Sequence, residues 1–132
     1  RMTEKRQEQP EYWSYPLEEG WQALAGKTAA DNDLLSLHFA RPNEFWFHVH
    51  DQPGSHVILR GPDDENPQPG RELLEQAAAI AAWHSKARNC TRCAVDCTQA
   101  RNVSKPKGAP PGTVTVSHIR LLKVKPALPE SP

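Results

Sequence analysis

The chain has 132 residues, of which 37% are hydrophobic and 13 are prolines, so it has room for one domain with a single core. No apolar run approaches the ~20 residues of a membrane-spanning helix and no signal-peptide pattern opens the chain, so we expect a soluble, cytoplasmic protein with no membrane partner. The net charge is zero, but residues 1–69 hold 6 Lys and Arg against 12 Asp and Glu, and residues 70–132 hold 10 against 4. The basic half is typical of a nucleic-acid footprint, with an ordinary solvated face as the alternative.

Composition divides the chain into three parts. Its first residues are charged and lack periodicity, an aromatic cluster follows at Tyr12–Tyr15, and prolines break up the last residues. We therefore expect a flexible N-terminal arm, one folded domain and a flexible tail, over residues 1–19, 20–126 and 127–132.

The first predicted elements are a strand and a helix. Gly20–Lys27 alternates as a short strand does. A helix follows, because Thr28, Asp31 or Asn32 can cap it and a leucine-rich face comes before Pro42. A strand in the second half of this segment is the less favoured alternative, since the capping residues precede it.

Glu44–Gly61 reads EFWFHVHDQPGSHVILRG and predicts a β-hairpin. Its residues alternate at a spacing of two, which sends apolar side chains to one face. A loop of Gln52, Pro53 and Gly54 pairs Val49 with Val57 and keeps that face wholly apolar. A two-residue loop would slip the register by one and mix the faces.

The other face of this hairpin is the predicted functional surface. It carries Trp46, His48, His50, His56, Ile58 and Arg60. The expected register sets His50 opposite His56, with His48 at about 7 Å from His56. It also places Trp46 opposite Arg60, within reach of a cation–π contact. A solvent-facing indole with imidazoles and a guanidinium suits base stacking and phosphate binding. The alternative for each residue is ordinary packing, most of all for His50.

The second half of the chain begins with an acidic loop and a helix. Pro62–Gly70 is rich in turn residues, and we expect it to be mobile. Arg71–Asn89 predicts the clearest helix, about 28 Å long at 1.5 Å per residue, with acids in its first turns and bases in its last. Its final turns bring His84, Ser85 and Arg88 towards a surface site.

The remaining elements complete the predicted fold. Cys93–Thr98 predicts a strand that leads into the loop Lys105–Gly112 (KPKGAPPG). The lysines and glycines of this loop make it a candidate phosphate clamp, with an ordinary connection as the alternative. Thr113–His118 and Leu121–Lys125 predict a closing hairpin. The order of elements predicts an α+β fold: a mostly antiparallel mixed sheet with one long helix and one shorter helix packed on it.

The three cysteines have a C-x2-C-x3-C spacing that invites a metal-site interpretation. On a strand, however, Cys93 and Cys97 lie ~13 Å apart at ~3.3 Å per residue, too far to share one ion. An odd count in a cytoplasmic protein also argues against structural disulfides. We therefore expect Cys90, Cys93 and Cys97 to be packing or loop residues, and neither a metal nor a cofactor.

Five stretches resemble, in this order, the NFACT RNA-binding domain: NDLLSLHFA, EFWFHVHDQPGSHVILRG, AAAIAAWHSKARN, AVDCTQ and VSKPKGAPPG. The likeness runs from about Trp21 to Pro126. This domain is also a C-terminal part of ribosome-quality-control factors historically called fibronectin-binding proteins in bacteria. The long members add an N-terminal NFACT domain, helix-hairpin-helix motifs and a coiled coil. None of those parts is found in these 132 residues, so the chain looks like a stand-alone member and the tailing of stalled nascent chains is not expected of it.

The resemblance implies RNA binding in translation, ribosome quality control or tRNA processing. The implied partners are tRNA or ribosomal RNA, together with the ribosome or a tRNA-modifying enzyme. The positions that match the family motifs are Asn32, His48, Ser55, His56, Lys105, Lys107 and Gly108. Three positions depart: Cys97 stands where tyrosine is more common, His84 where an aromatic residue is usual, and Ser104 where a basic residue is frequent. The last departure removes a phosphate contact.

We predict that Arg88, Arg101, Lys105 and Lys107 hold the RNA backbone and that Trp46, His48 and His56 engage a base or ribose. The full predicted RNA-binding set is Asn32, Trp46, His48, Ser55, His56, Arg60, Arg88, Arg101, Lys105, Lys107 and Gly108. A second hypothesis is an RNA-processing or RNA-modifying enzyme with His48 and His56 as general base and acid, although no carboxylate partner or metal motif supports it. A third is a protein-interaction module that uses the acidic half and the aromatic arm.

Overall fold

The computed structural model describes residues 8–62 and 66–130. Part of the acidic loop predicted to be mobile lies outside these residues. The described chain forms strands, helices and short turns in the following order: β1 (Tyr12–Pro16), η1 (Glu18–Gly20), β2 (Gln22–Gly26), α1 (Ala29–Leu34), η2 (Leu35–Phe39), β3 (Phe45–Val49), β4 (Val57–Arg60), α2 (Arg71–Trp83), β5 (Cys93–Gln99), η3 (Ala100–Asn102), β6 (Val103–Ser104), β7 (Thr115–Val116) and β8 (Arg120–Val124).

The centre of the fold is a six-stranded sheet with the strand order β1-β2-β4-β3-β5-β8, accompanied by the small pair β6-β7. All pairings between the described strands are antiparallel. Because helices accompany an antiparallel sheet, the predicted α+β class is confirmed. The prediction of a mixed sheet is wrong, since no described pairing is parallel. β1 pairs with β2 at one edge, for example Trp13 with Ala25, so this segment of the expected flexible arm is part of the sheet.

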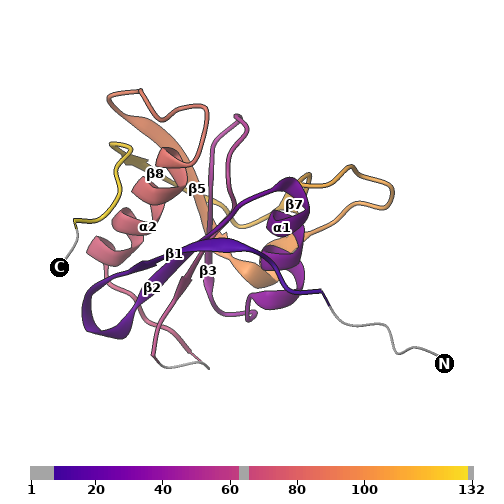
Figure 1. The fold of residues 1–132 in the computed structure, drawn as a ribbon, viewed down its shortest axis with the longest axis horizontal. Coiled ribbons are helices and arrows are strands. Elements are labelled where there is room, and N and C mark those ends of the chain that lie inside the picture. The colour runs from indigo at the N-terminus through magenta and orange to yellow at the C-terminus, as the bar shows by residue number, and fades with distance from the viewer. Residues whose placement is uncertain (1–7, 63–65, 131–132) are drawn as a thin grey trace.

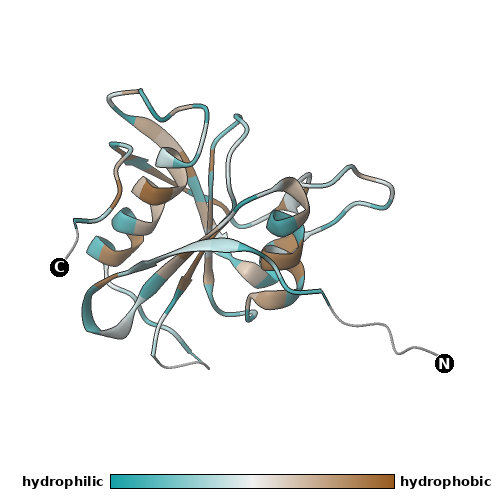
Figure 2. Ribbon diagram, viewed as in Figure 1, coloured by the Kyte–Doolittle hydropathy of each residue, from teal (hydrophilic) through white to brown (hydrophobic). Residues whose placement is uncertain are grey.

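The two helical segments cover opposite faces of the sheet (Figure 1). Neighbouring residues of a strand point to opposite faces, and the two cores follow this rule. Phe47 lies in the core beneath α2, whereas Trp46 lies in the core beneath α1 and η2. Both faces of the central strands are therefore apolar, and hydrophobic residues gather there and on the helices (Figure 2).

The first helical segment forms as its capping residues predict. Thr28 is the N-cap: its hydroxyl oxygen accepts a 3.1 Å hydrogen bond from the Asp31 N–H, and the Asp31 carboxylate accepts one from the Thr28 N–H. α1 continues into the π-helical turn η2, and together they span 11 residues. The alternative of a strand over this segment is therefore wrong.

α2 is shorter than predicted, because it ends at Trp83 and not at Asn89. It has 13 residues, so the expectation of one long and one shorter helix is also wrong. The turn between β3 and β4 takes over the backbone hydrogen bonds that would continue the helix. The Ser55 N–H donates to the His84 carbonyl at 2.8 Å, and the Lys86 N–H donates to the Pro53 carbonyl at 3.1 Å.

The register of the hairpin differs by two residues from the prediction. Phe47, and not Val49, pairs with Val57. A shift of two preserves the faces, so the predicted grouping of side chains survives while the cross-strand partners change. Beyond this pair the two strands separate: the His50 N–H continues the ladder to β5 by donating to the Ala94 carbonyl at 3.0 Å, and the loop bonds to the residues after α2.

The predicted closing hairpin does not form. Strand β7 pairs with β6, and β8 pairs with β5. A turn at His118, whose φ is +55°, separates the two segments. The Thr98 hydroxyl fixes this turn by donating to the carbonyls of Ser117, at 2.9 Å, and His118, at 3.1 Å.

Candidate nucleic-acid interface

A cleft of about 800 Å³ lies where the turn between β3 and β4 meets the residues after α2 and the start of α1. We name it the basic cleft, because the exposed side chains of Lys27, Lys86 and Arg88 line it. None of the described residues that line it is acidic. Such a cleft attracts polyanions, since neutralising a phosphate releases counterions.

One wall of the basic cleft is aromatic. The Trp13 ring, 39% exposed, stacks on His84 with ring centroids 4.4 Å apart and an interplanar angle of 11°. The Tyr15 hydroxyl lies 2.6 Å from His84 Nε2, and Lys27 Nζ lies 5.5 Å from the centroid of the Trp13 ring. Burial, together with the Arg88 charge, lowers the pKa of His84 to about 4. The wall is therefore a neutral aromatic plate beside cations.

Close packing around two glycines shapes the floor of the basic cleft. A Cβ at Gly54 would lie 2.7 Å from the Ser85 Cβ, and a Cβ at Gly26 would lie 2.1 Å from Asn32 Oδ1. The Ser55 hydroxyl donates to the Gly26 carbonyl at 2.6 Å, and Asn32 Oδ1 accepts from the backbone N–H of the residue after Ser55 at 3.0 Å. Asn32 and Ser55, two of the predicted site residues, line the cleft, and these bonds show that they hold it together.

Trp46 and His56 lie on the predicted side of the sheet, but they are only 1% and 2% exposed. The prediction that they face solvent is therefore wrong. Trp46 Nε1–H donates to Ser36 Oγ at 2.8 Å, and Ser36 Oγ lies 2.7 Å from His56 Nδ1. Ser36 belongs to η2, so this hydrogen-bonded triad attaches the helical cover to the sheet. Neither ring can stack on a base without displacing that cover.

His48 is the accessible member of the predicted histidine pair. Its ring centroid is 5.4 Å from that of His56, with the rings at 82°. Burial lowers the pKa of His48, although the Asp96 carboxylate opposes the change. A neutral ring in the wall of the basic cleft suits hydrogen bonding to a base or ribose. His56 is 2% exposed, so of the two imidazoles only that of His48 lines the basic cleft.

Arg60 makes an internal ion pair. Its guanidinium donates to both carboxylate oxygens of Glu44, at 2.6 and 2.8 Å, and to the Phe39 carbonyl at 3.1 Å. The Glu44 side chain is 2% exposed. The predicted pairing with Trp46 is wrong, because Ile58 stands opposite Trp46 and the guanidinium lies 4.6 Å from the centroid of the Phe39 ring.

The basic loop Lys105–Gly112 projects from the body beside α1, between β6 and β7 (Figure 1). Asp33 of α1 anchors it: Lys105 Nζ lies 3.0 Å from Asp33 Oδ2, and the Gly112 N–H donates to Asp33 Oδ1 at 3.1 Å. Gly108 has a φ of +80°, and Lys107 is exposed. The end of the loop borders the basic cleft through Gly112, whereas Lys105, Lys107 and Gly108 do not line it.

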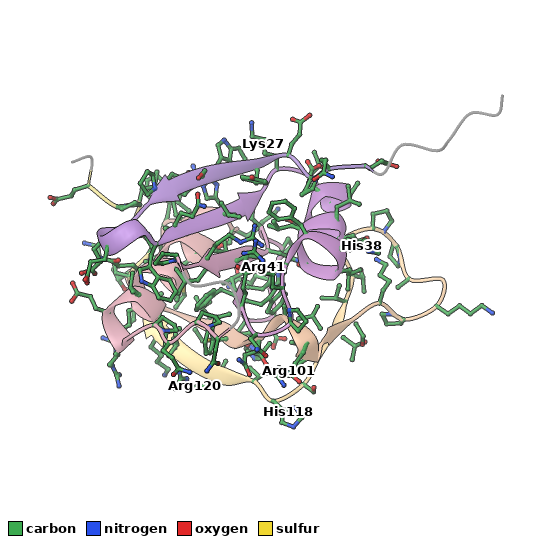
Figure 3. All side chains as sticks on the ribbon, turned by 90° about the horizontal axis from the view of Figure 1, so that it is seen from below. Lys27, His38, Arg41, Arg101, His118 and Arg120 are labelled. Carbon is green, nitrogen blue, oxygen red and sulfur yellow. The ribbon has the colours of Figure 1, made fainter. Side chains whose placement is uncertain are left out.

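Arg101 lies elsewhere on the molecule. It lines a second groove with Arg120 and His118, whereas Arg88 lines the basic cleft with Lys27. Figure 3 shows Lys27 on the opposite side of the molecule from Arg101, His118 and Arg120. The predicted phosphate-binding residues therefore do not form one site.

The buried histidines predict a pH dependence of stability. Burial, together with the neighbouring His48 ring, lowers the pKa of His56 to about 4. A group whose pKa falls on folding contributes stability above its unfolded pKa, near 6.5, and this contribution disappears as the pH drops towards 4. We expect the free energy of unfolding to fall by a value on the order of 3 kcal/mol between pH 6.5 and pH 4. Denaturant unfolding at a series of pH values measures this loss.

Histidine NMR titration provides an internal control for this prediction. His50 Nδ1 lies 2.9 Å from Asp96 Oδ1, and this hydrogen bond and the Asp96 charge raise the pKa of His50. We expect a midpoint about 4 for His56 and a midpoint above the ordinary value for His50. A midpoint near 6.5 for His56 would show that its ring is open to water.

The cysteines and helices of residues 8–62 and 66–130 bear on metal binding and on membrane spanning. Cys90, Cys93 and Cys97 are free thiols, and no group of His, Cys, Asp or Glu in this part of the chain is arranged to hold a metal ion. The helices described there are too short or too polar to cross a lipid bilayer.

Sequence reasoning missed several lining residues of the basic cleft, chiefly Trp13, Lys27 and Lys86. Trp13 stands in the aromatic cluster Tyr12–Tyr15. This cluster is too short for its alternation to distinguish a strand from a flexible arm. Lys27 lies at the end of a predicted strand with no motif around it. Only the packing of β1 beside the residues after α2 brings these side chains to one place.

Comparison with known proteins identifies relatives of this chain. Residues 12–118 match the family described as NFACT protein RNA binding domain. The Rqc2 homolog RqcH of Streptococcus suis is 40% identical over 103 residues, which cover 78% of this chain and 18% of that protein. The Rqc2 homolog RqcH of Bacillus subtilis is 38% identical over 102 residues, 77% of this chain and 17% of that protein.

A solved structure shares the fold. The C-terminal part of the fibronectin/fibrinogen-binding protein from Streptococcus suis superposes with a TM-score of 0.81 at 35% identity, over 96% of this chain and 49% of that chain. The chain thus spans less than a fifth of the length of the two RqcH proteins. On the family match, these identities and the shared fold, the chain belongs to the NFACT RNA-binding domain family.

Proposed function

We propose that the basic cleft binds RNA, with tRNA or ribosomal RNA as its target, and that the protein acts with the ribosome in quality control of translation. The observation that carries this proposal is the lining of the cleft: three exposed cations, an exposed indole and no acid among the described lining residues. The names of the RqcH relatives support the cellular role, and the family description supports RNA as the ligand.

Each lining group has a distinct task in this proposal. Lys27, Lys86 and Arg88 neutralise backbone phosphates, which gives affinity without sequence preference. Trp13 offers a flat apolar surface on which an unpaired base can stack once Lys27 moves aside. His48, neutral at pH 7, hydrogen-bonds to the base edge or the ribose. The cleft therefore suits single-stranded RNA better than a duplex, whose bases are already stacked.

The loop between β6 and β7 extends this surface. Lys107 is exposed and is available for a further phosphate. Lys105 has a different role, because its ammonium is already paired with Asp33. It orients the loop against α1, and Gly108 provides the turn with its positive φ.

The salt dependence of RNA affinity tests the proposal. We expect the double variant Lys27→Ala, Lys86→Ala to bind single-stranded RNA more weakly, with a slope of log K against log salt that is less negative by about 1.4, or 0.7 for each lost phosphate contact. The matched control is Lys123→Ala, Lys125→Ala, which removes two exposed lysines that do not line the cleft. Equal slopes for the two double variants would contradict the proposed site.

A further inference from the structure

A second groove, of about 1120 Å³, lies at the other end of α2 and β3 from the basic cleft. We name it the arginine groove. Arg71 comes from the first turn of α2, Arg101 from η3, and Arg120 from the start of β8. Phe45 and His118 also line the groove, and none of its described lining residues is acidic. Three chain segments that are distant in sequence thus bring guanidinium groups to one hollow.

The contacts of these arginines leave donors for a ligand. Arg71 Nε lies 3.1 Å from Glu75 Oε2, in an exposed pair of the kind that contributes little. Arg101 donates one Nη2–H bond to the Asn43 side chain, and the Arg120 charge lowers the pKa of the Cys97 thiol against the larger effect of burial. A guanidinium carries five N–H donors, so each of these contacts uses only part of the group.

The arginine groove and the basic cleft are too far apart for one nucleotide to contact both. Arg71 stands at one end of α2 and His84 follows the other end, and a helix of 13 residues is about 20 Å long. Strand β3 likewise begins with Phe45, in the groove, and carries His48, in the cleft, near its other end. Figure 3 shows the same separation between Lys27 and the Arg101, His118 and Arg120 cluster.

We propose that the arginine groove is a second binding site for the phosphate backbone of RNA, so that one molecule of this protein holds two RNA segments at once. The proposal rests on the proposed RNA-binding role of the basic cleft and extends it to a different surface. The planar guanidinium matches two phosphate oxygens at a time, and the chain belongs to an RNA-binding family. A guanidinium binds carboxylates with the same geometry, so the family match is what favours a nucleic-acid backbone over an acidic peptide.

Isothermal titration calorimetry tests the proposal by measuring how many molecules of a single-stranded RNA, too short to span both sites, bind to each protein molecule. The wild-type chain should take up two RNA molecules. The groove variant Arg71→Ala, Arg120→Ala should take up one, and the cleft variant Lys27→Ala, Lys86→Ala should also retain one site. The control Lys123→Ala, Lys125→Ala should behave as the wild type does. Because all these side chains are exposed, circular dichroism should show the same fold in each.

With a longer RNA that reaches both sites, the groove variant should have a salt slope less negative by about 1.4. The variant Arg71→Lys, Arg120→Lys keeps the charges and should recover most of that slope. If the wild type binds a single RNA molecule and only the cleft variant loses that binding, the second site is overturned and the proposed function stands. A single site lost only in the groove variant would overturn the cleft assignment and the two-segment model together. If the arginine groove binds a poly-glutamate peptide and does not bind RNA, the proposal of a second RNA site is also overturned.

Discussion

Glu44→Ala should lower the free energy of unfolding by about 3–5 kcal/mol, because it removes the buried carboxylate that both Nε and Nη2 of Arg60 bind. The Glu44 side chain is 2% exposed and that of Arg60 13% exposed. Glu44 Oε1 also accepts a 2.8 Å hydrogen bond from the Arg41 N–H, so the substitution removes a backbone partner as well. Chemical denaturation followed by tryptophan fluorescence measures the loss.

The double variant Glu44→Met, Arg60→Met is the control. It removes both charges and fills the space with apolar side chains, and such a replacement is often close to neutral. We expect it to recover most of the stability lost in Glu44→Ala. A loss below about 1 kcal/mol in Glu44→Ala would contradict the description of this pair as buried, since that is the range of exposed pairs. RNA affinity of the folded double variant should equal that of the wild type, which separates Arg60 from the RNA-binding surface.

Trp46→Ala should destabilise the protein by about 3–5 kcal/mol, the range for removing a large buried aromatic side chain. Trp46 is 1% exposed and packs among Leu24, Leu35 and Ile58 beneath the helical cover. Its indole also donates to Ser36 Oγ, so Trp46→Phe should cost about 1 kcal/mol for the lost hydrogen bond. Thermal or denaturant unfolding measures both losses.

The contrast with Trp13 makes this prediction a test of function. Trp13→Ala should weaken RNA binding with little change in stability, because its side chain is 39% exposed and lines the basic cleft. Trp46→Phe should leave the affinity of the folded protein unchanged. The opposite result, in which Trp46→Phe lost affinity at wild-type stability, would show that the ligand reaches the covered face and that η2 moves away to admit it.

Alternation along the central hairpin predicted which side chains share a face, and the structure confirms that grouping. His48 and His56 are on one side of the sheet with their rings in contact, although the register is two residues away from the expected one. The same alternation could not show that the second face is covered. A spacing of two is the same whether solvent or another element lies over a face. The alternation of β3 therefore does not show that η2 folds back over Trp46, as the hydrogen bond from its indole to Ser36 Oγ requires.

The end of α2 shows the same limit at the level of the backbone. Residues 84–89 carry no strong helix breaker, so local propensity favours a longer helix. The helix stops because Pro53 and Ser55 bond to the backbone there, and that competition exists only after the hairpin has docked. By ending at Trp83, the chain places His84 against Trp13 and Arg88 beside the basic cleft.

Sequence by itself determined the α+β class, the helix capped by Thr28, the sides of the strands and the family, because these depend on neighbouring residues and short motifs. Tertiary structure alone decided which of the predicted residues meet solvent and which meet one another. It buried Trp46 and His56, drew Arg60 into an ion pair with Glu44, assembled the basic cleft from β1, the end of β2 and the residues after α2, and moved Arg101 into a separate groove. The physical reason is that exposure and proximity depend on which elements pack over each face, and this packing joins segments that are distant along the chain.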